Sequence, residues 1–142
     1  HVTATDISSQ ALEVANYNAT KLCVKDRVKF IECDLANINS TYNIVVCNPP
    51  YLSVKEYKKT SLEIQLYEPK IAFISNKDGY EAYFRIAEIL PKILINDSLV
   101  FMEIGSTQAK KTNIIFKNNN INCLEIVKDI QNLDRVLILN KP

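Results

Sequence analysis

Hydrophobic and polar positions follow two different periods along this chain, and the alternation between the periods predicts its elements. Short apolar runs that end at a charged residue, a proline or a glycine are typical of strands, and apolar residues spaced three and four apart, such as Leu12, Ala15 and Ala19, are typical of helices. We expect strands at residues 1–6, 28–33, 43–47, 99–104, 121–128 and 135–139. We expect one helix capped by Ser8 or Ser9, one beginning near Asp78, one at 107–117, and a short helix at 61–66 inside an otherwise irregular segment 52–78.

The order of these elements predicts an open α/β sheet whose strands are largely parallel. Residues 43–47 (NIVVC) are apolar nearly throughout, which indicates a strand buried on both faces. The connection between Lys128 and Arg135 is short enough for a hairpin, so we expect an antiparallel strand at the edge of the sheet. Pro91 falls inside a helical pattern and is expected to kink that helix or to begin a second turn.

The composition narrows the class of protein without identifying a reaction. The 142 residues suit one domain, the hydrophobic fraction of 47% is that of a globular protein, and the net charge of +1 provides no long-range attraction for nucleic acid. No apolar run approaches the length of a membrane span. The four cysteines lack the spacing of a metal site and are expected to be reduced thiols of a cytoplasmic protein.

Histidine and glycine are scarce, and their scarcity limits the possible chemistry. The only histidine is His1, so mechanisms that rely on a histidine base are not supported. The only glycines, Gly79 and Gly105, lie too far apart to form a glycine-rich phosphate-binding loop. The sequence opens without a methionine, and we expect it to be a piece of a longer protein or a protein whose start was removed.

Acidic residues follow the first two expected strands, at the edge where open α/β sheets bind ligands. Asp6 ends the first strand, where a carboxylate can accept hydrogen bonds from ribose hydroxyls or can cap the next helix. Asp34 ends the second strand and can accept a hydrogen bond from an adenine amino group, with Leu35 packing on the ring. A simple turn carboxylate is the alternative interpretation of Asp34.

The sharpest chemical signal is the tetrapeptide Asn48-Pro49-Pro50-Tyr51, directly after the third expected strand. The two prolines fix the backbone and remove two N–H donors, so the loop presents carbonyl groups without competing donors. The Asn48 side-chain oxygen and the Pro49 carbonyl can then accept both hydrogens of a planar –NH₂ group, on whose face Tyr51 can stack. Holding both hydrogens favours the attacking state of a poorly nucleophilic nitrogen. The alternative is a rigid turn without chemistry.

With this tetrapeptide the chain resembles the S-adenosylmethionine-dependent amino-methyltransferases, whose signature is (Asp/Asn/Ser)-Pro-Pro-(Tyr/Phe/Trp). Within them it is most similar to the HemK-type protein-(glutamine-N5) methyltransferases, which methylate the Gly-Gly-Gln glutamine of peptide chain release factors. The resemblance covers nearly the whole chain, in segments 3–19 (TATDISSQALEVANYNA), 67–69 (YEP), 77–79 (KDG), 101–105 (FMEIG) and 134–136 (DRV).

The resemblance implies an α/β, Rossmann-like class I methyltransferase sheet, mostly parallel with an antiparallel C-terminal edge hairpin. Residues 1–142 are expected to form the C-terminal part of a single methyltransferase catalytic domain. The implied cofactor is S-adenosylmethionine, bound at its ribose by Asp6 and at its adenine by Asp34 and Leu35. No metal is implied.

The resemblance also assigns the substrate site. Asn48 would contact both the cofactor and the substrate amide, and Asn48, Pro49, Pro50 and Tyr51 together would form the glutamine pocket. Asn48, Pro49 and Tyr51 would be the catalytic residues. The expected partner is a peptide chain release factor as protein substrate, with no direct binding of nucleic acid or membrane.

The chain departs from the family pattern at its start. The family's glycine-rich loop, its first, central strand and its N-terminal helical domain have no counterpart, and Asn96-Asp97 replaces a double glycine. In the family the first strand lies between the strands ending at Asp6 and at Cys47, so we expect unpaired edges at both. We therefore expect the 142-residue chain by itself to be poorly stable and to bind cofactor weakly or not at all.

Two other functions stay open from the sequence. N6-adenine and N2-guanine nucleic-acid methyltransferases share the tetrapeptide, although they normally carry a basic recognition region. The second is a non-enzymatic remnant of a split gene, which would also lack the glycine-rich loop. The segments 67–69 and 77–79 favour the protein-glutamine class over the nucleic-acid methyltransferases, and the remnant stays open.

Overall fold

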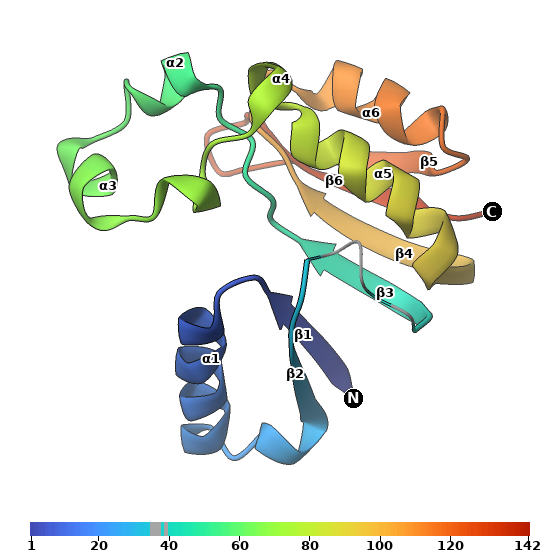
Figure 1. Ribbon diagram of the computed structural model, residues 1–142. Helices are drawn as coiled ribbons and strands as arrows, with labels where there is room; N and C mark the ends of the chain where they lie inside the picture. Colours follow the sequence, from blue (N-terminus) through green and yellow to red (C-terminus); the bar gives the residue numbers. More distant parts are fainter. Residues whose placement is uncertain (35–37, 39) are drawn as a thin grey trace. The chain divides into compact units, whose positions relative to one another are not determined.

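Residues 1–34, 38 and 40–142 are described by the computed structural model, in which the chain divides into the units His1–Asn39 and Ser40–Pro142 (Figure 1). We call them the N-terminal unit and the C-terminal unit and describe each by itself. None of the helices in these residues has the length and hydrophobicity of a membrane span.

The N-terminal unit consists of two parallel strands with one helix packed against them. Its elements are β1 (Val2–Asp6), α1 (Ser9–Lys21), the 3₁₀ turn η1 (Lys25–Arg27) and β2 (Val28–Glu32). The register places Asp6 beside Glu32, so the carboxyl ends of β1 and β2 lie at one edge. Of the two candidate serines, Ser8 is the N-cap, because its side chain accepts a hydrogen bond from the Ala11 N–H. The positions of β1, α1 and β2 confirm the two strands and the helix that the sequence predicts for this part of the chain.

The C-terminal unit is built on a four-stranded sheet in the order β3-β4-β6-β5 (Figure 1). Its strands are β3 (Tyr42–Cys47), β4 (Leu94–Glu103), β5 (Asn122–Lys128) and β6 (Asp134–Asn140). Its helices are α2 (Val54–Tyr57), α3 (Leu62–Tyr67), η3 (Lys70–Ala72), α4 (Asn76–Gly79), α5 (Glu81–Ile93) and α6 (Ala109–Lys117). β3 runs parallel to β4, whereas β6 is antiparallel to both of its neighbours, β4 and β5.

The expected C-terminal hairpin is confirmed, and its two strands have different positions in the sheet. After α6 the chain enters β5, which pairs only with β6 and forms the edge. The chain then turns back, and β6 lies between β4 and β5, bonded to both. The antiparallel strand is therefore internal and the sheet of this unit is mixed.

One face of this sheet is buried beneath α5 and α6, which lie side by side over it (Figure 1). Val100 and Met102 of β4 and Leu137 and Leu139 of β6 are 0% exposed. The buried residues of α5 recur at helical spacing and are Tyr83, Ile86, Ala87, Leu90 and Ile93. This face forms the hydrophobic core, because burial of apolar side chains is the main favourable contribution to folding.

The opposite face of β3 is exposed, so the expectation of a strand buried on both faces is wrong for this chain. The Ile44 and Val46 side chains are 60% and 79% exposed. They alternate with Val45 and Cys47, whose partners Val100 and Met102 lie in the core. β3 is the end strand of its sheet, and no described helix of the C-terminal unit covers these two side chains.

Two element boundaries differ from the expected ones for local reasons. α5 begins at Glu81 rather than near Asp78, because Lys77 (φ 52°), Asp78 (φ 57°) and Gly79 (φ 88°) adopt left-handed conformations that a right-handed helix cannot contain. Pro91 lies within the last turn of α5, which continues to Ile93.

β4 also begins earlier than expected, at Leu94 rather than Leu99, and contains an irregularity. The register with β3 shifts between Tyr42 and Ile44, where the left-handed Asp97 (φ 61°) accommodates the extra residues of β4. The Asp97 N–H donates to the Lys141 carbonyl at 3.1 Å, which keeps the irregular part attached to the chain end after β6.

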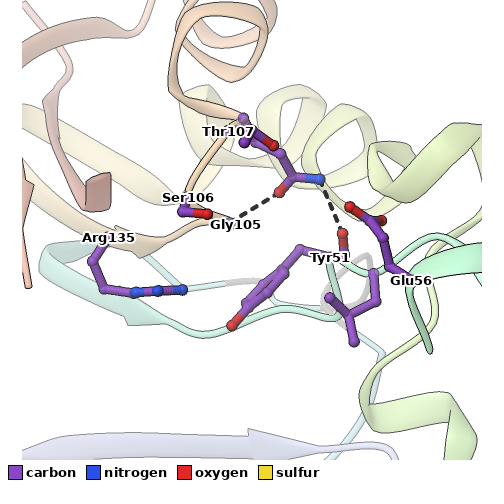
Figure 2. A pocket seen from close by; sticks show the side chains of 8 residues that line it. Tyr51, Glu56, Gly105, Ser106, Thr107 and Arg135 are labelled. Atoms are coloured by element: carbon purple, nitrogen blue, oxygen red, sulfur yellow. Dashed lines mark hydrogen bonds between the residues drawn. The ribbon is translucent and has the colours of Figure 1, made fainter. Parts of the chain in front are cut away.

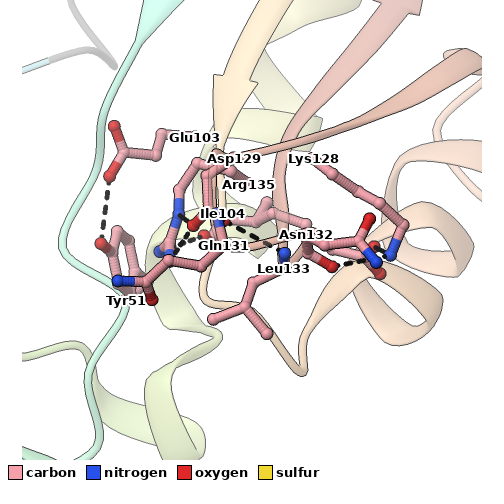
Figure 3. A network of polar contacts seen from close by, with 10 residues as sticks. Tyr51, Glu103, Ile104, Lys128, Asp129, Gln131, Asn132, Leu133 and Arg135 are labelled. Carbon is pink, nitrogen blue, oxygen red and sulfur yellow. Dashed lines mark hydrogen bonds and ion pairs between the residues drawn. The ribbon is translucent and has the colours of Figure 1, made fainter.

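Asp129 closes the turn between β5 and β6 (Figure 3). Its Oδ1 accepts hydrogen bonds from the N–H groups of Gln131 (2.9 Å) and Leu133 (3.1 Å), and its Oδ2 accepts from Arg135 Nη2 (3.0 Å) and Nε (3.2 Å). These hydrogen bonds, of which the one from Leu133 has the largest effect, hold the pKa of the Asp129 carboxyl below its usual value. Arg135 Nη1 also donates to the Ile104 carbonyl at 3.4 Å, so the turn is attached to the residue after β4.

We predict that Asp129 makes the stability of the full-length protein sensitive to acid. A carboxyl whose pKa is depressed on folding contributes stability above its unfolded pKa, about 3.9, and loses it as the pH falls through the lower folded value. Asp129→Asn keeps an acceptor oxygen and removes the charge. We expect a lower urea midpoint than wild type at pH 7 and a difference that shrinks below about pH 4. Equal midpoints at pH 7 would contradict the prediction.

Candidate functional site

The candidate site begins where β3 and β4 end. The parallel register pairs Cys47 with Met102, so the residues that follow both strands leave the sheet at one edge. Pro49 is buried, whereas the side chain of Asn48 is exposed and makes no hydrogen bond to the described part of the chain. The tetrapeptide therefore has a buried anchor and a free amide group next to it.

Tyr51, the last residue of the tetrapeptide, is fixed at both of its polar ends. Its hydroxyl donates to Glu103 Oε1 on β4 at 3.0 Å (Figure 3), and its carbonyl accepts from Gln108 Nε2 at 2.9 Å (Figure 2). Burial, followed by the hydrogen bond to the Glu103 carboxylate, raises the pKa of the Tyr51 phenol. The tyrosine is neutral at pH 7 and is held in place from β4 and from the start of α6.

The chain after the tetrapeptide is fixed by backbone hydrogen bonds. Leu52 forms an isolated parallel bridge with Ile74, in which the Leu52 N–H donates to the Phe73 carbonyl and the Ser75 N–H donates to the Leu52 carbonyl, both at 2.9 Å. The Ser75 hydroxyl in turn accepts from the Ala82 N–H at 2.9 Å near the start of α5. Residues 48–52 are thus attached to a second segment that is distant in sequence.

Gly79 packs directly against the Tyr51 carbonyl. The residue is buried, with a φ of +88°, and a Cβ at this position would overlap the Tyr51 carbonyl oxygen and lie 2.9 Å from Gln108 Nε2. The two residues before it, Lys77 and Asp78, are also left-handed, a conformation that costs non-glycine residues roughly 1–2 kcal/mol. Only glycine fits between this turn and the tetrapeptide.

Gln108 connects these parts through a buried side chain that is 5% exposed. Its Oε1 accepts from the Gly105 N–H and from the Tyr83 hydroxyl, both at 3.0 Å, while its Nε2 donates to Tyr51. The sequence analysis identified neither Gln108 nor Glu103. Their positions in the sequence were the only indication of a role. Glu103 lies near the end of the fourth expected strand, and Gln108 lies three residues after Gly105.

A cavity of about 240 Å³ adjoins the tetrapeptide (Figure 2). Three parts of the C-terminal unit line it: Tyr51, Leu52 and Glu56 after β3, residues 105–108 after β4, and Arg135 on β6. The Glu56 carboxylate and the Arg135 guanidinium line it from different segments, and the hydroxyls of Ser106 and Thr107 add polar groups. Such a cavity, mixed in polarity and next to a rigid loop, is suited to a small polar group on a flexible chain.

Cys47, Tyr51 and Tyr83, which lie around the strand ends, do not act as bases at pH 7. Burial raises the pKa of the Cys47 thiol to about 11. Burial also raises the pKa values of Tyr51 and Tyr83 above that of an ordinary tyrosine. All three groups are protonated and neutral at pH 7, so they act through hydrogen bonding and packing.

The N-terminal unit brings Asp6 and Asp34 to one edge of its sheet. Asp6 is exposed at the end of β1, and its Oδ1 accepts from the Ser8 N–H at 2.8 Å. Ser8 rather than Asp6 is the N-cap of α1, and the Asp6 carboxylate bonds to the N–H of that capping residue. Asp34 follows β2 by two residues, and the Cys33 N–H before it donates to the Asp6 carbonyl at 3.0 Å. Leu35 lies outside the described residues.

These residues include carboxylate acceptors and no recognisable metal site. The described part of the chain contains no group of three or more His, Cys, Asp or Glu side chains that could hold one metal ion. Hydroxyl groups of a sugar are the natural partners of an exposed carboxylate such as Asp6 at a strand end.

The fold has a clear counterpart among solved structures. A ribosomal protein L11 methylase from Lactobacillus delbrueckii subsp. bulgaricus is similar with a TM-score of 0.70 and 17% sequence identity, over 98% of this chain and 56% of that chain. The architecture is therefore that of the α/β, Rossmann-like methyltransferase fold, with a mixed sheet and an antiparallel C-terminal hairpin.

Sequence comparison identifies the family. The model of the RMKL-like methyltransferase domain matches residues 1–77, and the chain belongs to this family. It is 37% identical over 138 residues to a release factor glutamine methyltransferase of Thermodesulfovibrio yellowstonii, covering 96% of this chain and 49% of that protein. It is 38% identical over 141 residues to a bifunctional methyltransferase of Rickettsia felis, covering 98% of this chain and 27% of that protein. The chain thus spans between a quarter and a half of the length of these relatives.

We predict that Gly79→Ala destabilises the full-length protein by about 2 kcal/mol, because the new Cβ meets the Tyr51 carbonyl in a left-handed conformation. Asp78→Gly is the matched control in the same turn. Relief of its left-handed strain offsets the higher chain entropy of glycine, so its stability should stay within about 0.5 kcal/mol of wild type. Urea unfolding measures both, and equal stability of Gly79→Ala and wild type would contradict the close approach.

Proposed function

We propose that this chain is the substrate-binding part of an S-adenosylmethionine-dependent methyltransferase that modifies the side-chain amide nitrogen of a protein glutamine. One observation carries the proposal: the Asn48-Pro49-Pro50-Tyr51 loop is anchored at the end of β3, while the exposed amide of Asn48 makes no hydrogen bond to the residues that the structure describes. The relatives named release factor glutamine methyltransferases support the same substrate class. The peptide chain release factor is accordingly the proposed partner.

The loop binds and orients the substrate amide. The Asn48 side-chain oxygen and the Pro49 carbonyl accept the two amide hydrogens, and Tyr51 packs on the face of the amide. This arrangement localises the nitrogen lone pair and aims it, which is catalysis by position and electrostatics rather than by a base. The bound cofactor supplies an electrophilic methyl group on a positively charged sulfur. The new N–CH₃ bond would form as the methyl–sulfur bond breaks, which leaves a neutral thioether, and one of the two amide protons would pass to solvent. Cys47 and Tyr51 hold their own protons at pH 7 and do not accept it.

The cofactor's adenosine is assigned to the N-terminal unit. The exposed carboxylate of Asp6 suits the ribose hydroxyls, and Asp34, at the same edge, suits the adenine amino group with Leu35 against the ring. The parallel register of β1 and β2 supports this assignment, because it places both carboxylates beyond adjacent carboxyl ends.

We further propose that residues 1–142 are the C-terminal part of one catalytic domain, in which another strand of the full-length protein pairs with both β1 and β3. Each of these strands has a neighbour on one side only in the described sheets. The exposed Ile44 and Val46 of β3 are apolar, as expected for a strand that is covered in the complete domain. The completed sheet would be mostly parallel.

The function is tested by methyl transfer with the full-length protein and radiolabelled S-adenosylmethionine. We predict that label enters the glutamine of a Gly-Gly-Gln sequence in a peptide chain release factor, and that a release factor carrying Gly-Gly-Glu stays unlabelled. Double-stranded DNA and ribosomal RNA are offered in parallel reactions. Label in nucleic acid without label in protein would replace this function by nucleic-acid methylation, and no label in any substrate would refute it.

We predict that Asn48→Ala lowers kcat by roughly 100-fold or more, because it removes one of the two acceptors for the amide hydrogens. The Kd for S-adenosylmethionine should change by less than about threefold, since most cofactor contacts are assigned to other residues. Asn43→Ala, which changes an exposed asparagine at the other end of β3, is the matched control. Equal losses of turnover and cofactor affinity would count against the role of Asn48 in holding the amide.

A further inference from the structure

Gln108 occupies a position where its side chain would ordinarily serve its own helix. It is the N-cap of α6, a place that favours short polar side chains which accept from the first N–H groups of the helix. The Gln108 side chain makes no such capping bond. It is bonded instead to Tyr51 and Gly105 (Figure 2) and also to the Tyr83 hydroxyl, so its hydrogen bonds connect other segments rather than cap the helix.

The orientation of the Gln108 amide is determined by its surroundings. Oε1 faces the N–H of Gly105, a group that can only donate, and Nε2 faces the carbonyl of Tyr51, a group that can only accept. A flipped amide would place donor against donor and acceptor against acceptor in a side chain that is 5% exposed. The Nε2 donor therefore has a defined role, which is to hold the Tyr51 carbonyl.

The Tyr51 carbonyl oxygen is in close contact with two residues. Gln108 Nε2 bonds to it at 2.9 Å, and Gly79 packs against the same oxygen without room for a Cβ. This carbonyl belongs to the Tyr51–Leu52 peptide, whose N–H donates to the Phe73 carbonyl at 2.9 Å. The peptide that leads out of the loop is therefore bonded on both sides, and the fixed φ of the two prolines leaves the preceding carbonyls few torsions through which to move.

We propose that Gln108 is a positioning residue for methyl transfer, which fixes the Tyr51 carbonyl through Nε2 and thereby keeps the acceptors of Asn48 and Pro49 in register with the substrate amide. The inference rests on the proposed function, because it names a residue that acts on the same loop. In this role Gln108 acts through Tyr51.

In the full-length protein, Gln108→Glu keeps the acceptor oxygen at Oε1 and replaces the Nε2 donor by a second acceptor oxygen. The carboxylate still accepts from Gly105 and Tyr83, but it places an acceptor against the Tyr51 carbonyl, so kcat at pH 8 should fall at least tenfold, with a smaller change in KM. A protonated carboxyl can donate to that carbonyl again, and burial raises the pKa of such a group. We therefore expect the ratio of variant to wild-type kcat to rise as the pH is lowered from 8 to 5.5.

Gln65→Glu is the matched control, because the Gln65 Nε2 also donates to a backbone carbonyl, that of Thr60, at 2.8 Å. It should keep the wild-type kcat at every pH. Tyr83→Phe removes one donor to Oε1 and leaves the bond to Tyr51, so it should lower kcat less than Gln108→Glu does. A wild-type kcat for Gln108→Glu at pH 8, or a loss that does not recover at low pH, would overturn the inference.

Amide hydrogen exchange tests the same inference independently of activity. At pH 8, Gln108→Glu should speed exchange at least tenfold relative to wild type at Leu52 and Ser53, whose N–H groups are hydrogen-bonded, whereas Gln65→Glu should leave these amides unchanged. If the wild-type protein transfers no methyl group to the Gly-Gly-Gln substrate, the proposed function fails. The exchange rates then still test whether Gln108 holds the loop. Unchanged exchange in Gln108→Glu would overturn the positioning role even in an active methyltransferase.

Discussion

The parallel pairing of β3 with β4 is the constraint on which the rest of the site depends. It places Cys47 beside Met102, so the proline loop and the end of β4 leave the sheet at one edge. The two prolines end β3 there because they cannot donate to a continuing ladder. β4 then leads through Gly105 into α6, and Tyr51 comes within hydrogen-bond distance of side chains more than 50 residues away. A slip of one residue in this register would move every contact of the loop to the wrong face.

The C-terminal unit is organised around a core on one side of its sheet. Val100, Met102, Leu137 and Leu139 are fully buried beneath α5 and α6, and the other side of β3 carries exposed apolar residues. The candidate site lies at the end of the buried side, where Tyr83 of α5 connects the core to Gln108. The rigidity of the loop therefore derives from the core itself, because the residue that holds Gln108 Oε1 is 0% exposed.

The sequence was sufficient to predict those features of the structure that depend on residues close together along the chain. Alternating periods predicted the strands of both units, the helices α1, α5 and α6 and the short α3, and the proline pair located the loop at a strand end. These features depend on neighbouring residues only. The sequence was insufficient to predict features that depend on packing between residues far apart in the sequence. The burial of β3 depends on which elements cover it, and the delayed start of α5 depends on three left-handed residues that the pattern does not reveal. Gln108 and Glu103 were missed because a polar residue near a helix or strand end is unremarkable until its partners are known.

The chemistry assigned to this loop requires rigidity more than basicity. Cys47, Tyr51 and Tyr83 are all neutral at pH 7, so none of them can remove a proton from a bound amide before it reacts. What these residues provide is a fixed frame, and a misplacement of about 1 Å can cost a hundredfold in rate. The loop is accordingly held by independent contacts to β4, to α6, to the turn before α5 and to the segment after η3. Removing any one of these contacts would leave the fold in place and still loosen the acceptors, which is why the residues behind the loop are as much a part of the site as the loop.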